Sequence, residues 1–163
     1  MSSYPRPRYD GDAGEVSAAF RPHDAEPDLA NPPGPTVHYL STGAGTGGDF
    51  GLYRWDFGER SGGPGPHFHR TIAESFFILS GAVRLYDGNT WFRAISGDFL
   101  FVPPGGIHAF RNDPGEAASM LLLFTPGAPR EDYFETTMEL ARGLTMTEEE
   151  KADFYRRHDN HWL

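Results

Sequence analysis

The middle of the chain, residues 36–126, consists of short apolar or alternating runs separated by turn residues. Alternation of apolar and polar positions, interrupted by glycine and proline, is typical of strands in a β-sandwich or β-barrel. The expected strands are 36–41, 50–57, 74–79, 82–86, 90–95, 99–102, 107–111 and 118–125. Asp87-Gly88, between two of these runs, predicts a tight hairpin. The pattern therefore predicts an all-β barrel.

The apolar spacing lengthens towards a helical period after residue 126. Tyr133, Phe134 and Met138 fall on one helical stripe. Thr147 followed three residues later by Glu150 has the form of a capping box, which marks the start of a second helix. We therefore expect a short helical segment at the C-terminus.

These patterns divide the chain into three segments. Residues 1–35 are rich in proline and have little apolar periodicity, so we expect an extended arm. Residues 36–126 form the barrel. Residues 127–163 are too few for a second domain, and we expect their helices to pack on the barrel.

Composition and charge narrow the function classes. The chain has 163 residues, with 14 Lys and Arg against 23 Asp and Glu and a formal net charge of −9, which argues against a nucleic-acid partner. It has no cysteine, so disulfides, thiolate metal sites and cysteine nucleophiles are excluded. No apolar run approaches the ~20 residues of a membrane span. Since the N-terminus does not have the pattern of a secretion signal, we expect a cytoplasmic protein without a membrane partner.

Three histidines and one glutamate in the strand region form a candidate metal site. His67 and His69 are two residues apart, so on a strand they point to the same face. Glu74 begins the next apolar run, and if this run pairs with the histidine strand, its carboxylate comes back opposite the imidazoles. His108 lies on a later strand. Side chains from separate strands can converge on the concave inside of a barrel, and this nitrogen and oxygen set suits a divalent transition metal with open positions.

The same residues follow the two sequence motifs of the cupin superfamily, which the chain resembles over roughly residues 36–126. The motifs are G-x5-H-x-H-x3-4-E-x6-G and G-x5-P-x-G-x2-H-x3-N. The matching residues are His67, His69, Glu74, Gly81, Gly97, Pro103, Gly105, His108 and Asn112. The one departure is the leading glycine of the first motif, where Ser61 stands beside Gly62. The resemblance implies a small cupin β-barrel, also called a double-stranded β-helix or jelly roll, with one metal held by His67, His69, Glu74 and His108.

Within this superfamily the chain is similar to the single-domain quercetin dioxygenase-like cupins of bacteria, including their short helical tail. This resemblance implies a metal-dependent oxygenase, dioxygenase-like in its chemistry, that acts on a small organic molecule of the enol or phenol type. Glu74 would then be both a metal ligand and a general base on the substrate hydroxyl. Fe(II) is favoured as the single metal ion, while Mn, Ni, Co and Zn also suit the ligand set.

Two other functions stay open. Some small cupins are linked to aromatic polyketide tailoring, so a redox-neutral cyclase or isomerase of secondary metabolism, with the metal as a Lewis acid, is one alternative. A non-catalytic cupin that binds a small molecule or a metal is the other. Thiol dioxygenases of this fold use three histidines without a glutamate, so Glu74 argues against them. Oxalate-degrading relatives are either disulfide-bonded and secreted or built of two barrels, and neither description fits.

Strand parity also predicts a substrate pocket beside the metal. Phe76 and Ile78 share the face of Glu74, and Phe110 shares the face of His108. Such a lining suits an aromatic small-molecule substrate. Single-domain cupins commonly form dimers, so the resemblance implies a homodimer, in which the proline-rich arm could be exchanged between subunits. We interpret the polar residues at 158–161 as a helix end and tail packing and not as a second ligand cluster.

Overall fold

The computed structural model describes residues 4–60 and 62–163, so Ser61, the departure from the first cupin motif, lies outside the described residues. The strands are β1 (Leu29–Ala30), β2 (Thr36–Ser41), β3 (Gly51–Asp56), β4 (His67–Phe68), β5 (Ala73–Ser80), β6 (Ala82–Tyr86), β7 (Trp91–Ile95), β8 (Phe99–Val102), β9 (Ala109–Arg111), β10 (Ser119–Thr125) and β11 (His161–Trp162). The helices are α1 (Glu131–Ala141) and α2 (Glu148–Arg157).

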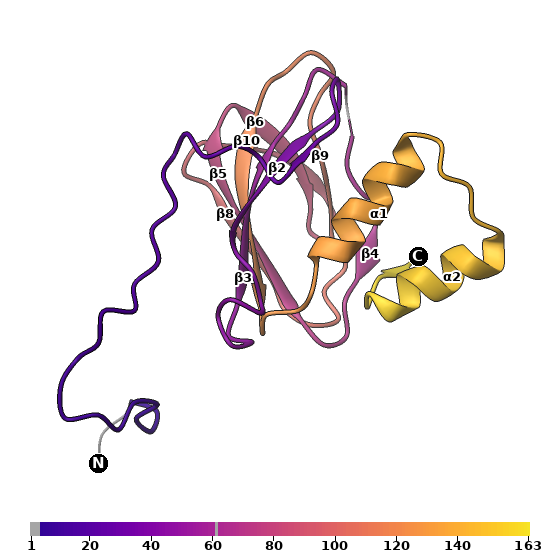
Figure 1. Ribbon diagram of the computed structural model, residues 1–163. Helices are drawn as coiled ribbons and strands as arrows, with labels where there is room; N and C mark the ends of the chain where they lie inside the picture. Colours follow the sequence, from indigo (N-terminus) through magenta and orange to yellow (C-terminus); the bar gives the residue numbers. More distant parts are fainter. Residues whose placement is uncertain (1–3, 61) are drawn as a thin grey trace.

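The strands form three antiparallel sheets (Figure 1). The largest has the order β1-β2-β3-β10-β5-β8, a second has the order β7-β6-β9, and β11 pairs with β4 in a third. Every strand run expected from the sequence is present, with ends that differ by two residues or fewer. The prediction of an all-β jelly-roll barrel with a short helical segment after it is confirmed.

A hairpin joins β6 and β7, as Asp87-Gly88 predicted. Tyr86 pairs with Trp91, so four residues separate the strands. Gly88 has the left-handed φ of 92° that the turn requires, and the Asp87 carboxylate accepts hydrogen bonds from the backbone N–H groups of Asn89 and Thr90. The hairpin predicted at Asp87-Gly88 is therefore present, and the Asp87 side chain stabilises its turn.

The core lies between the six-stranded and three-stranded sheets. Tyr53 and Phe76 from the first sheet and Leu85 from the second are fully buried in one cluster. On the opposite face of β8, Phe99 and Phe101 are 63% and 56% exposed. Strand alternation thus decides which aromatic side chains fill the barrel and which lie outside it.

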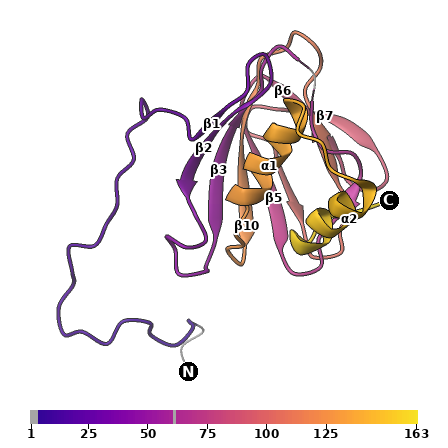
Figure 2. The ribbon, with the colours of Figure 1, turned by 45° about the vertical axis from the view of Figure 1, so that its right-hand side comes forward.

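The two C-terminal helices extend this core, and Figure 2 shows α1 lying against the barrel. Phe134 of α1 packs edge-to-face on Tyr53 and Trp55, with ring centroids 5.2 and 5.5 Å apart. Phe154 of α2 stacks on Tyr133 of α1 at 5.6 Å. The predicted capping box is present, with the side chain of Thr147 and the side chain of Glu150 each bonded to the other residue's backbone N–H.

The first residues of the described chain run away from the barrel as an extended arm (Figures 1 and 2). Residues 4–20 are all exposed, and the arm joins the barrel where β1 pairs with β2. Neither helix in the described part of the chain is long and apolar enough to cross a membrane. The homodimer, the exchange of the arm and the cytoplasmic location stay predictions.

Candidate metal centre

Three strands and the segments beside them place the four predicted metal ligands. His67 is in β4, His69 follows its end, Glu74 is in β5, and His108 precedes β9. His67 and His108 form an antiparallel bridge, in which each backbone N–H bonds to the other residue's carbonyl at 3.0 and 2.9 Å. The bridge fixes two imidazoles side by side.

The Glu74 strand does not pair with the histidine strand. β5 pairs with β8 and β10, whereas β4 pairs with β11 at the C-terminus. The carboxylate therefore approaches the imidazoles from a different sheet. The four residues still meet because they all point into the same barrel interior.

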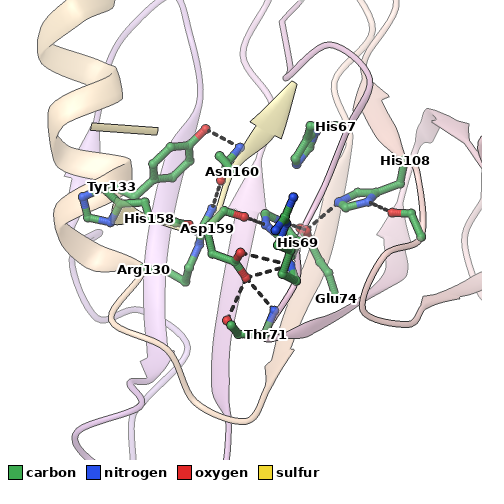
Figure 3. Close-up of polar contacts among 12 residues, drawn as sticks. His67, His69, Thr71, Glu74, His108, Arg130, Tyr133, His158, Asp159 and Asn160 are labelled. Carbon is green, nitrogen blue, oxygen red and sulfur yellow. Dashed lines mark hydrogen bonds and ion pairs between the residues drawn. The ribbon is translucent and has the colours of Figure 1, made fainter. Parts of the chain in front are cut away.

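The four side chains form one buried cluster (Figure 3). One potential ligand atom from each of His67, His69, Glu74 and His108 lies within 4.8 Å of the others. Glu74 Oε2 lies 3.1 Å from His69 Nε2 and 2.8 Å from His108 Nε2. All four residues are at most 3% exposed, so water is largely excluded from the cluster.

Hydrogen bonds on the far side of each ring fix which nitrogen faces the centre. The backbone carbonyls of Gly65, Asp159 and Gly106 lie 2.9, 2.7 and 2.9 Å from Nδ1 of His67, His69 and His108. Since a carbonyl can only accept, each Nδ1 carries the proton, and each neutral ring presents the lone pair of Nε2 inward. Lone pairs and a carboxylate this close together repel unless a cation or protons lie between them. The donor set therefore suits a divalent metal ion.

The electrostatics of the metal-free cluster agree with this pattern for His67 and Glu74, whereas the Glu74 carboxylate favours a proton on His108. Burial, together with the neighbouring His108, lowers the pKa of His67 to about 3. Burial alone would raise the pKa of Glu74, but His108 and His69 together hold it well below its usual range. Burial opposes a charge on His108, yet the Glu74 carboxylate raises its pKa above the ordinary value. At neutral pH, Glu74 is thus an anion and His67 a neutral ligand.

A cavity of about 330 Å³ adjoins the cluster. His67 and Glu74 contribute to its wall, and most of the remaining lining is aromatic or aliphatic, including Trp55, Phe134 and Trp162. A concave apolar space with a few polar groups is the usual form of a small-molecule site.

The residues predicted for the pocket divide into two kinds. Phe110 lines the cavity. Phe76 and Ile78 are fully buried in the core and are not among the described residues that line it, although the Phe76 ring lies 5.9 Å from that of His108 and 5.6 Å from that of Phe110. All three face the barrel interior as strand parity predicted, and their role towards a substrate stays a prediction.

Sequence reasoning missed the part that the C-terminal tail takes in this centre. The carbonyl that accepts from His69 Nδ1 belongs to Asp159, whose φ of 55° is left-handed. The Asp159 carboxylate in turn accepts from the backbone N–H groups of Arg70 and Thr71 and from the Thr71 hydroxyl, at 2.7–3.0 Å. The only sequence signal was an Asp-Asn pair after a helix, which tolerates left-handed backbone.

Arg130, just before α1, was missed as well. It is 3% exposed, lines the cavity and donates to the His158 carbonyl and the Asn160 side chain (Figure 3). Nothing in its local sequence distinguishes it from a surface arginine, because its burial depends on the tail folding back over it.

Comparison with known proteins agrees with the barrel. Residues 53–124 match the family model described as a cupin domain. An uncharacterized protein of Aquifex aeolicus (strain VF5) is 31% identical over 67 residues, which are 41% of this chain and 54% of that protein. The match therefore spans about half the length of the curated relative.

Solved structures show the same fold. KdgF from Halomonas sp. is 18% identical with a TM-score of 0.58, over 69% of this chain and 96% of that one. The polyketide cyclase RemF from Streptomyces resistomycificus is 23% identical with a TM-score of 0.55, over 66% and 80% of the two chains. The motifs, the barrel and the family match over residues 53–124 together identify a cupin domain in this chain.

Proposed function

We propose that this cupin is a metal-dependent enzyme that acts on a small enol or phenol-type molecule, with oxygenation by dioxygen as the leading reaction. The observation that carries the proposal is the buried cluster of three inward-facing Nε2 atoms and one carboxylate beside an aromatic cavity. A thiolate-free set that leaves coordination positions open is more typical of catalytic than of structural metal sites.

His67, His69 and His108 would hold the metal through Nε2, and Glu74 would hold it through its carboxylate. A bound divalent ion supplies a Lewis acid next to the substrate oxygen. Fe(II) is the favoured ion, and Mn, Ni, Co and Zn suit the same donors. The aromatic walls would hold a flat substrate and exclude water from the reacting oxygen.

Glu74 would take the proton of the substrate hydroxyl. The proton moves from the substrate oxygen to a carboxylate oxygen of Glu74, leaving an enolate or phenolate. Because the neighbouring imidazoles hold the pKa of Glu74 low, this carboxylate is a weak base. It therefore suits a substrate with an acidic hydroxyl, such as an enol or a catechol-like phenol.

The test is oxygen uptake by Fe(II)-loaded protein with a panel of enols and flavonols, comparing wild type with Glu74→Gln. The amide has the shape of the carboxylate but is a far weaker proton acceptor, so we expect turnover to fall at least 100-fold, the usual lower range for general-base catalysis. Glu149→Gln makes the same chemical change on the exposed first turn of α2 and should leave turnover unchanged. Normal turnover in metal-loaded Glu74→Gln would show that the base role is wrong.

A redox-neutral cyclase or isomerase is the second candidate. The mostly apolar cavity, with several aromatic side chains in its wall, and the shared fold with a polyketide cyclase favour it. Product formation that is unchanged under strict anaerobiosis would support this reaction and refute the oxygenase. Metal binding without turnover of any compound in the panel would favour the third possibility, a binding protein.

A further inference from the structure

Arg130 is a buried cation in the wall of the cavity. It is 3% exposed and lines the same space as His67 and Glu74. Among the described residues, no ion pair includes Arg130. A buried charge without a direct counter-charge is unfavourable and needs compensation from elsewhere.

The hydrogen bonds of Arg130 are also incomplete. One N–H donates to the His158 carbonyl at 2.6 Å and another to Asn160 Oδ1 at 3.0 Å, and both acceptors are neutral. The buried Nε–H has no acceptor among the described residues. The guanidinium otherwise faces aromatic rings, 4.2 Å from the Tyr133 centroid and 5.2 Å from the Phe124 centroid. Since buried donors in proteins are nearly always satisfied, the spare capacity of this guanidinium indicates a missing acceptor.

The charge balance of the cavity indicates the sign of that acceptor. Glu74 contributes one negative charge, Arg130 offsets it, and Arg60, an exposed residue at the cavity wall, adds a second positive charge. A divalent ion on the three histidines and Glu74 would then leave the cavity positive. Because the remaining lining is mostly apolar, an anionic ligand is favoured in this space. The planar donor fork of arginine pairs with a carboxylate through two parallel N–H···O bonds.

We propose that Arg130 is a specificity-determining residue that binds a carboxylate of the substrate inside the cavity. The substrate class is then a hydroxylated aromatic or enolic carboxylic acid, whose hydroxyl reaches the metal centre while its carboxylate meets Arg130. The hydroxyl half of this assignment rests on the proposed function. Binding of the carboxylate by Arg130 does not require a metal, so it can be measured with metal-free protein.

Arg130 also holds the tail through His158 and Asn160, so its variants must separate ligand binding from tail docking. Arg130→Met removes the charge and both hydrogen bonds. Asn160→Asp keeps an oxygen acceptor beside the guanidinium and adds an internal carboxylate that competes with a bound one. Arg156→Met removes an exposed arginine of α2, whose side chain is 69% exposed, and is the matched control.

The experiment measures calorimetrically the affinity of salicylate and of its neutral analogue salicylamide, with metal-free and with zinc-loaded protein. In wild type and Arg156→Met we expect salicylate to bind at least tenfold tighter than salicylamide, in both metal states. In Asn160→Asp and Arg130→Met we expect this ratio to fall to near one, while salicylamide affinity stays within about threefold. Thermal unfolding and zinc affinity report whether the tail remains docked.

The outcomes distinguish the inference from the proposed function. A salicylate preference that persists in folded Asn160→Asp overturns the carboxylate role, and so does a wild type with no preference or no binding of either probe. If Arg130→Met fails to fold, Asn160→Asp alone decides the matter. A protein that binds no metal but still prefers salicylate through Arg130 would refute the proposed metal enzyme and keep the carboxylate subsite.

Discussion

Replacement of Asp159 by asparagine should weaken metal binding although Asp159 does not reach the metal cluster with its own side chain. Its carbonyl orients the His69 ring, and its carboxylate holds that carbonyl in place by accepting hydrogen bonds from Arg70 and Thr71. Asparagine has nearly the same shape and tolerates the left-handed φ of 55°. The substitution therefore removes charge and one acceptor oxygen with little strain in the backbone.

The size of the effect follows from these contacts. Hydrogen bonds to a charged acceptor contribute roughly 1.5–3 kcal/mol each, against about 1 kcal/mol for neutral ones. In Asp159→Asn, two or three hydrogen bonds change from a charged acceptor to a neutral one. Because the site is partly exposed, this change should weaken tail docking by about 1–3 kcal/mol in total. This corresponds to a factor of about five to about 150. It agrees with the roughly 10–100-fold loss of metal affinity that follows from removal of a hydrogen-bond partner of a metal-bound histidine.

The assay is competition for zinc between the protein and a fluorescent chelator at pH 7. Asp153→Asn is the control, because Asp153 is an exposed carboxylate of α2 that pairs only with Arg156 and Arg157 among the described residues. We expect a clear loss of zinc affinity in Asp159→Asn and none in Asp153→Asn. Equal zinc affinity, within twofold, in a folded Asp159→Asn protein would refute the idea that the tail positions His69.

Two further predictions concern the stability of the fold. Gly81→Ala should lower the free energy of unfolding, measured by urea denaturation, by about 2–4 kcal/mol. The left-handed backbone at this position costs a non-glycine residue about 1–2 kcal/mol. The new Cβ would also lie 2.3 Å from the Ala117 carbonyl oxygen, which forces the backbone to shift. Gly97→Ala shares the positive φ but meets no atom within 4 Å, so it should lose only the backbone part; equal losses at both positions would contradict this account. Burial, aided by nearby arginines, lowers the pKa of His158 despite the opposing Asp132, so the unfolded chain binds that proton at higher pH than the folded one. The contribution of His158 to stability is therefore complete above about pH 6.5 and is lost as pH falls, and His158→Phe should reduce the difference in unfolding free energy between pH 7.5 and pH 5.5.

The local pattern of the chain was enough to predict the barrel strands and the side chains that face inward. Alternation along β10 places every second residue in the core, because successive side chains of a strand point to opposite faces. The motif spacing likewise brought His67, His69, Glu74 and His108 to a common interior. Strand positions and the direction of each side chain depend on residues that are close in sequence. The period of the apolar pattern therefore predicts them.

Strand pairing and the surroundings of the site depended on the closed barrel. The sequence did not show that β5 pairs with β8 and β10, nor that β4 is covered by β11. It also gave no sign that the carbonyl behind His69 comes from a residue 90 positions later, or that the same tail buries Arg130. Contacts this far apart in sequence form only when the whole chain has folded. No local periodicity encodes them, because many pairings would bury the same apolar faces, and only the packing of the complete barrel and tail selects one.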